Sequence, residues 1–350
     1  MTVKVTKKGE LIRNTILSLF GKKTSLSFAE IYKGSKELNL SESAIRKHVC
    51  NLVEQHCLNL QKNEKKRVIY SLCDSFVKSF TYDLNVLDPN NGDEMAIWIR
   101  DIEPLLTIQN KGCIDILETA FCEIFNNAMS HSNGSSVRVY LNSNALQTKI
   151  IIQDNGIGIF KKIKDCLNLP DERQSLLELS KGKMTTDAKD HSGEGIFFVS
   201  KACDFFAIVS GDLVFSHNEQ MAIDLLEQQK IPLEHGTLVY MLVNNNTSRN
   251  MKKVYDKFAS PEGGFTKTLV PVKLLRYKNE GIVSRSQAKR LMARVDRFKH
   301  VCLDFEGIDQ IGQGFADEIF RVYASNHPDV QITTLNTNTE IMNMIKHVTA

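Results

Sequence analysis

The stretch KIIIQDNGIGI, residues 149–159, places a short apolar run directly before an aspartate and two closely spaced glycines. Lys149–Ile152 is rich in β-branched residues and is typical of a buried strand. The Asp-Asn-Gly that follows has the composition of a turn. One interpretation is simply a strand, a turn and the next element. The other is that Asp154 faces a ligand, while Gly156 and Gly158 allow the backbone to approach it closely.

The composition of the 350-residue chain is that of a soluble globular protein, with 42% apolar and 24% charged residues. This length suggests two or three domains. No run of about 18 apolar residues occurs, so no membrane span is expected, and the basic start lacks the apolar core of a signal peptide. The eight cysteines form no C-x-x-C pair and indicate reduced, buried thiols in a cytoplasmic protein.

Charge is unevenly distributed, although the net charge of the chain is only +3. Residues 1–80 contain 15 Lys and Arg against 7 Asp and Glu, whereas residues 81–250 contain 14 against 23. Residues 251–350 are again basic, with 15 against 11. We therefore expect the two ends and the middle to meet different partners.

The first 80 residues carry three helical patterns followed by a hairpin pattern. The helices are expected over Glu10–Phe20, from Ser27 to about Leu38, and from Ser41 onward. Two alternating segments, 58–60 and 68–72, flank a basic tip and predict the strands of the hairpin.

Helix, helix, helix and hairpin in this order resemble the winged helix-turn-helix of transcription regulators. The resemblance implies that the third helix enters the major groove of DNA and that the hairpin neutralises phosphates. The alternatives are that these charges form a solvated face, or that the domain binds only protein. The residues expected to contact DNA are Ser43, Arg46, Lys47, Lys65, Lys66 and Arg67.

In the middle of the chain, residues 111–132 predict a helix that carries Glu123 and Asn127 four positions apart on one side. The pair is either an exposed polar edge or a water-activating base beside an oxygen ligand for Mg²⁺. Strands are expected at Val137–Leu141 and Lys149–Gln153.

Two further glycine motifs follow. Gly193 and Gly195 precede an apolar helix over 196–203, and the N-terminus of a helix favours phosphate. The pair Gly236-Thr237 opens a strand within 234–243.

Glu123-x-x-x-Asn127, Asp154-x-Gly156-x-Gly158, Gly193-x-Gly195 and Gly236-Thr237 thus occur in one order along the chain. Together they resemble the nucleotide-binding boxes of the GHKL ATPase superfamily, which includes gyrase, heat-shock chaperones, histidine kinases and mismatch-repair proteins. The resemblance covers about residues 85–245. It implies an α/β sandwich with helices on one face of a mixed sheet, and ATP with Mg²⁺ as ligands.

The resemblance also implies a role for each residue of these motifs. Asp154 would accept a hydrogen bond from the adenine amino group, which selects adenine over guanine. Asn127 would bind Mg²⁺, Glu123 would be the general base, and residues 160–191 would form a lid. The other expected nucleotide contacts are Gly156, Gly158, Lys183, Ser192, Gly193, Gly195 and Thr237, with Thr185–Thr186 as further candidates.

The middle of the chain departs from the histidine kinases in two ways. Those kinases often carry a Lys three residues after the Asn, and here that position is Ser130, followed by His131. No pair of helices with a phosphoacceptor histidine precedes the motifs, so a histidine kinase is not expected. NNAMSHS at 126–132 is closer to the anti-sigma-factor serine kinases.

The last hundred residues alternate between strand and helix patterns, which suggests a small α/β domain. The stretch VCLDFEGIDQIGQGFADEIF, 301–320, resembles the strand-loop-helix of STAS domains. Those domains often carry a phosphorylatable Ser at the start of this helix. Gln313 and Gly314 stand there instead, so a phosphorylation switch is not expected at that point. The expected elements are strands at 268–275, 301–305 and 330–335, helices at 284–298 and 312–324, and a last helix opened by Thr337 and Glu340.

The complete arrangement resembles a bacterial regulator family of uncharacterised function. We expect a winged helix over 1–80, a GHKL ATP-binding domain over 81–258 and a STAS-like domain over 259–350. The leading hypothesis is a DNA-binding regulator whose state is set by Mg-ATP binding and slow hydrolysis, with the STAS-like domain serving a protein partner or self-association. The alternatives are a serine/threonine protein kinase acting in trans, or an ATP-driven dimer clamp.

Overall fold

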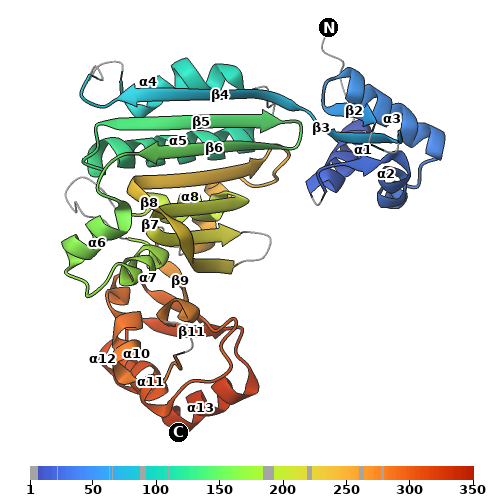
Figure 1. The fold of residues 1–350 in the computed structure, drawn as a ribbon. Coiled ribbons are helices and arrows are strands. Elements are labelled where there is room, and N and C mark those ends of the chain that lie inside the picture. Colours follow the sequence, from blue (N-terminus) through green and yellow to red (C-terminus); the bar gives the residue numbers. More distant parts are fainter. Residues whose placement is uncertain are drawn as a thin grey trace.

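The structure, a computed structural model, describes residues 7–21, 23–62, 64, 66–86, 92–106, 108, 110–183, 193–218, 223–259, 264–276 and 280–350. Over these residues the chain is a multidomain α/β protein with three separate sheets, of three, five and three strands. The amino-terminal and carboxy-terminal units contact different sides of the middle unit (Figure 1).

The amino-terminal unit packs three helices against a small sheet. The side chains of Ser27 and Ser41 accept hydrogen bonds from Glu30 N and Ala44 N, so both predicted helix starts are confirmed. The predicted hairpin is confirmed by the antiparallel pairing of β2 with β3. The elements are α1 (Lys7–Ser18), a 3₁₀ turn (Leu19–Gly21), β1 (Leu26–Ser27), α2 (Phe28–Gly34), a 3₁₀ turn (Lys36–Leu38), α3 (Glu42–Glu54), β2 (Leu58–Lys62) and β3 (Val68–Leu72).

The chain enters the central sheet before the expected domain boundary between residues 80 and 81. Strand β4 (Asp74–Asp83) pairs with β5 over its whole length and directs Tyr82 into the central core. The alternation of Phe76, Phe80 and Tyr82 therefore belongs to the middle unit, and the boundary lies between the hairpin and β4.

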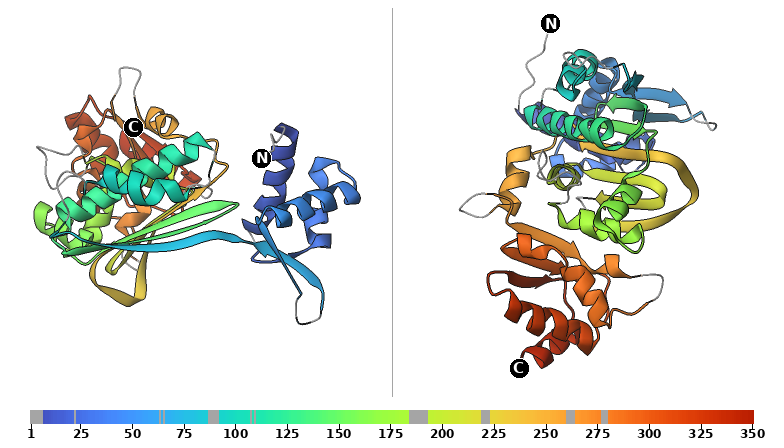
Figure 2. Two further views of the ribbon diagram at one scale, coloured as in Figure 1. Left: turned by 90° about the horizontal axis from the view of Figure 1, so that it is seen from above. Right: turned by 90° about the vertical axis from the view of Figure 1, so that its left-hand side faces the viewer.

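The middle unit is a five-stranded sheet in the order β4-β5-β6-β8-β7. All four pairings are antiparallel, whereas the resemblance implied a mixed sheet. Helices cover one face of the sheet (Figure 2). The elements after β4 are α4 (Glu94–Ile97), a π turn (Trp98–Ile102), a 3₁₀ turn (Glu103–Leu105), α5 (Lys111–His131), β5 (Ser136–Asn144), β6 (Gln147–Asp154), α6 (Ile159–Leu167), α7 (Arg173–Lys181), α8 (Gly195–Ala202), β7 (Phe205–Asn218), β8 (Ile223–Asn244) and α9 (Met251–Phe258).

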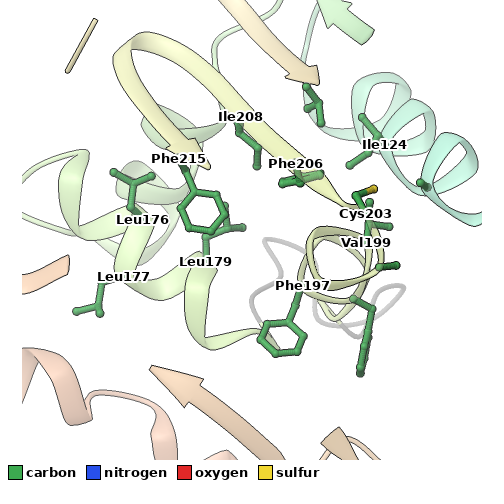
Figure 3. Close-up of a cluster of buried hydrophobic side chains, with 14 of the residues drawn as sticks. Ile124, Leu176, Leu177, Leu179, Phe197, Val199, Cys203, Phe206, Ile208 and Phe215 are labelled. Atoms are coloured by element: carbon green, nitrogen blue, oxygen red, sulfur yellow. The ribbon is translucent and has the colours of Figure 1, made fainter. Parts of the chain in front are cut away.

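Buried apolar side chains hold α8 in the core of the middle unit. Val199 and Cys203 of α8 lie on the side of this helix that faces Ile124 of α5 and Phe206 of β7, whereas the Phe197 ring lies on the other side (Figure 3). These side chains are almost fully buried, so α8 is held against α5 by apolar packing.

The carboxy-terminal unit has a parallel three-stranded sheet in the order β11-β10-β9. The predicted alternation of strands and helices is confirmed. The elements are β9 (Lys267–Pro271), a 3₁₀ turn (Val272–Leu275), α10 (Arg285–Met292), a 3₁₀ turn (Val295–Arg297), β10 (His300–Asp304), α11 (Gln313–Asp317), a π turn (Glu318–Tyr323), α12 (Ala324–Asn326), β11 (Gln331–Leu335) and α13 (Thr339–Thr349).

Three expected boundaries in this unit are wrong. The first strand ends at Pro271, because proline has no N–H for the ladder. The second element does not continue as a helix to Phe298, because Arg294 adopts a left-handed conformation with φ of 59°. The last helix is capped by Asn338 rather than Thr337, since the Asn338 side chain accepts the hydrogen bond from Ile341 N at 2.9 Å.

Candidate functional site

A cavity of about 150 Å³ lies between α5, α6, α8 and strands β6 and β8. All four sequence motifs contribute to its lining, although they are distant in the chain. The predicted site residues that line it are Glu123, Asn127, Asp154, Gly158, Gly193, Gly195 and Thr237.

One wall of the cavity is a face of α5 that presents Glu123 and Asn127. The Asn127 Nδ2 group donates to the Glu123 main-chain oxygen at 2.7 Å and to Glu123 Oε1 at 3.1 Å. Both of these bonds use Nδ2, and neither uses the amide oxygen. An amide oxygen of this kind can ligate a hard cation such as Mg²⁺.

Asp154 ends β6 and is only 6% exposed. Its Oδ1 accepts hydrogen bonds from Gly156 N at 2.8 Å and Thr237 N at 3.3 Å. Burial raises the pKa of this carboxyl, and the bonds from Gly156 and Thr237 oppose the shift. Since Asp154 lines the cavity, a ligand N–H that reached it would stabilise the ionised form.

Two glycines beside the cavity combine a positive φ with a close neighbour. Gly158 has φ of +87°, and an added Cβ would lie 2.5 Å from Ser210 Oγ. Gly236 has φ of +78°, and its Cβ would lie 2.0 Å from the Asp154 main-chain oxygen. Both positions therefore need glycine.

The absence of a side chain at Gly195 allows the first turn of α8 to lie against Glu123. An added Cβ at Gly195 would lie 1.8 Å from Glu123 Cδ. The first N–H groups of a helix have no partner within the helix and carry a partial positive charge. The start of α8 thus offers donors for an anion beside Glu123 and Asn127.

Sequence reasoning missed the contribution of α6. Ile159, Lys162 and Ile163 also line the cavity. The Lys162 amine donates to the main-chain oxygen of His131 at 2.5 Å, and burial lowers its pKa. The spacing of these three residues could have predicted their common role, because positions i, i+3 and i+4 of one helix share a face.

Lys183, an expected phosphate contact, is not part of this lining. Its amine donates to the Arg297 main-chain oxygen at 3.1 Å and lies 4.9 Å from the centre of the Phe298 ring. Three other expected residues and one expected DNA contact lie outside the described residues: Thr185, Thr186, Ser192 and Lys65.

The expected DNA contacts that the structure describes are all exposed. Ser43, Arg46 and Lys47 lie on α3, while Lys66 and Arg67 lie at the tip of the hairpin. The Arg46 guanidinium is already engaged, since it pairs with Glu42 at 2.9 Å and lies 3.8 Å from the centre of the Phe28 ring.

Comparison with protein families matches residues 287–342 to the STAS-like domain of unknown function (DUF4325). The match runs from α10 into α13, so the carboxy-terminal unit contains a STAS-like domain. No curated protein and no solved structure matches the chain. Every helix of the described part of the chain is too short or too polar to cross a membrane.

Proposed function

We propose that this protein binds Mg-ATP in the cavity between α5 and α8 and uses the nucleotide to control DNA binding by its amino-terminal unit. The observation that carries the proposal is the convergence of the four motifs on one cavity. Their order along the chain and their common site agree with a GHKL-type domain.

The cavity suits an adenine nucleotide. Ile124, Ile159 and Val239 provide apolar walls, and a cavity of about 150 Å³ can hold a planar aromatic ring. Asp154 is the acceptor for the amino group of the base. Gly193 and Gly195 at the start of α8 would hold the phosphates.

Asn127 and Glu123 have separate roles beside the phosphates. The Asn127 amide oxygen ligates Mg²⁺, and the hydrogen bonds to Glu123 fix the orientation of this amide. Glu123 orients a water or a hydroxyl and accepts its proton. When bound, ATP supplies the phosphoanhydride bond that this step breaks.

The amino-terminal unit is proposed to bind DNA as a winged helix. Its three helices, its hairpin and the basic charge of residues 1–80 support this assignment. Arg46 can still reach DNA, because an exposed ion pair such as that with Glu42 is worth only about 0.2–1 kcal/mol.

The proposal predicts that DNA affinity changes with the nucleotide. Fluorescence anisotropy of labelled genomic fragments is to be measured without nucleotide, with Mg-ADP and with a non-hydrolysable Mg-ATP analogue. At a nucleotide concentration that just saturates the wild type, we expect DNA affinity to differ between these states in the wild type and to differ much less in Asp154→Asn, because this variant binds adenine nucleotides more weakly. DNA binding that is equal in all states would contradict control by nucleotide. Absence of DNA binding at low salt would contradict the DNA-binding role.

The hairpin tip provides a second prediction. Replacing both Lys66 and Arg67 with Gln should weaken DNA binding at every sequence and lower the slope of log affinity against log salt by about 1.8, since each phosphate contact contributes about 0.9. The control is Lys252→Gln with Lys346→Gln, which removes two exposed charges elsewhere. An equal slope in wild type and hairpin variant would place the DNA contact on another surface.

The contact between Glu123 and Asn127 supports a second candidate function, a serine/threonine kinase acting in trans. A general base beside a magnesium ligand serves transfer to a hydroxyl as well as to water. Incubating cell extract with γ-labelled ATP and the protein distinguishes the two. Labelled protein that is lost with Glu123→Gln supports the kinase, and release of free phosphate alone supports hydrolysis.

A further inference from the structure

A buried lysine binds the end of α7 to the STAS-like unit, which is the carboxy-terminal unit from Phe265 to α13. Lys181 is 2% exposed, and its amine lies 2.8 Å from Glu178 Oε1. The same amine donates to the main-chain oxygens of Arg290 at 3.2 Å and Ala293 at 2.9 Å. These oxygens belong to the end of α10 and the residue after it, where carbonyl groups lack partners within a helix. Lys181 therefore joins α7 to α10 through a fully buried ammonium group.

Further bonds continue this contact toward Lys183. The other Glu178 oxygen lies 3.2 Å from an Arg294 nitrogen, and Thr268 Oγ1 donates to the Lys181 main-chain oxygen at 2.7 Å. The Arg297 guanidinium donates to the Lys183 main-chain oxygen at 2.9 Å. The STAS-like unit thus fixes the backbone from Lys181 to Lys183.

Phe265, at the start of the STAS-like unit, packs against α8, whose first residue lines the cavity, and against the end of α7. Its ring centre lies 4.7 Å from that of Phe197 in α8 and 5.1 Å from that of Phe298. A Cβ at Gly182 would lie 2.7 Å from the Phe265 ring, so this ring also packs against the end of α7. Phe197 lies two residues after Gly195, which touches Glu123.

We propose that docking of the STAS-like unit controls the affinity of the cavity for nucleotide phosphates, so that a partner bound to this unit regulates the ATP site. The coupling runs from Lys181 through α7, which packs against α6 and α8 of the cavity wall, and from Phe265 directly through α8. The coupling is reciprocal. If docking of the STAS-like unit changes the affinity for nucleotide, then nucleotide binding changes the docking equilibrium by the same factor. The proposal rests on the proposed function, since it names the regulation of the same cavity.

The test uses the full chain with Lys181→Met, which keeps the length of the side chain but removes its charge. Equilibrium binding is measured for Mg-ATP and for adenosine. We expect ATP to bind about 5- to 150-fold more weakly and adenosine to bind as in the wild type, because the coupling acts on the phosphate end. The control is Lys289→Met, since Lys289 lies on α10 but is exposed and pairs with Glu318 only at 3.9 Å.

Each outcome has a distinct meaning. A folded Lys181→Met protein that binds ATP as tightly as the wild type overturns the proposal, as does an equal loss for ATP and adenosine. If the variant does not fold, amide hydrogen exchange of the wild type decides: saturating Mg-ATP must slow exchange at 290–298, and unchanged exchange there overturns the proposal. A wild type that binds adenosine and ATP not at all shows instead that the proposed nucleotide site is wrong.

Discussion

Replacing Asp154 with Asn is expected to weaken ATP binding about 10- to 100-fold, the equivalent of one hydrogen bond to a charged group. Both main-chain bonds to this side chain fall on Oδ1, and an Asn oxygen can keep them. The Asn NH₂ would then occupy the place of Oδ2, where it meets the adenine amino group as one donor facing another. Preference for ATP over GTP should fall for the same reason, because guanine presents a carbonyl there.

The pH dependence of binding provides a check on the Asp154 prediction. Burial raises the pKa of Asp154, so ATP affinity should fall on acidification at a pH above the ordinary aspartate pKa of about 3.9. Stability of the nucleotide-free protein should change in the opposite direction, because a carboxyl whose pKa is raised by folding favours the folded state as the pH falls. Above its raised pKa the buried carboxylate opposes folding, so Asp154→Asn should be at least as stable as the wild type at neutral pH. This advantage should shrink as the pH falls and Asp154 takes up its proton.

Calorimetric titration with ATP and GTP, together with thermal melts at several pH values, measures these effects. Asp165→Asn is the matched control, because Asp165 is an exposed carboxylate on α6. An Asp154→Asn protein that binds ATP as tightly as the wild type would refute the role of Asp154 in recognising adenine.

The second large effect is expected at Gly195. An added Cβ would lie 1.8 Å from Glu123 Cδ, so Gly195→Ala must displace the carboxylate. The clash involves the end of a flexible side chain, and Gly195 does not have a positive φ. We therefore expect only a modest loss of stability. The displaced Glu123 would leave the Asn127 amide and lose its position as general base, a role typically worth 10²–10⁴-fold in rate.

Single-turnover hydrolysis or phosphoryl transfer should accordingly fall by about 100-fold or more in Gly195→Ala, as in Glu123→Gln. The control is Gly281→Ala, where the nearest atom to an added Cβ is a Val283 methyl at 3.4 Å. Unchanged turnover in a folded Gly195→Ala protein would exclude Glu123, in this position, from the chemical step.

Local chemistry explains why many elements could be predicted from the sequence. The predicted helix over 111–132 is α5 (Lys111–His131), because its apolar face and its Asn110 cap are both local features. The strands around 137–141 and 149–153 follow from β-branched alternation in the same way. The four motifs also predicted that Glu123, Asn127 and Asp154 share one site, and the three residues line the same cavity.

Other features depend on chain segments far apart in the sequence. The sequence around Lys183 predicted a phosphate contact because a lysine lies near a glycine motif. In the structure its amine instead donates to the main-chain oxygen of Arg297, 114 residues away. The buried position of Lys181 likewise exists only because the end of α10 supplies carbonyl oxygens to it.

The sequence by itself therefore predicted many of the helices and strands, the basic, acidic and basic sections of the chain, and the four motifs whose residues line the cavity. The tertiary structure alone decided that β4 belongs to the central sheet, that Lys162 enters the cavity and that the STAS-like unit holds α7 and α8. The physical reason is that periodicity, caps and turn residues act over a few positions along the chain. The partner of a buried face or a buried charge is selected only when distant segments compete to pack against it.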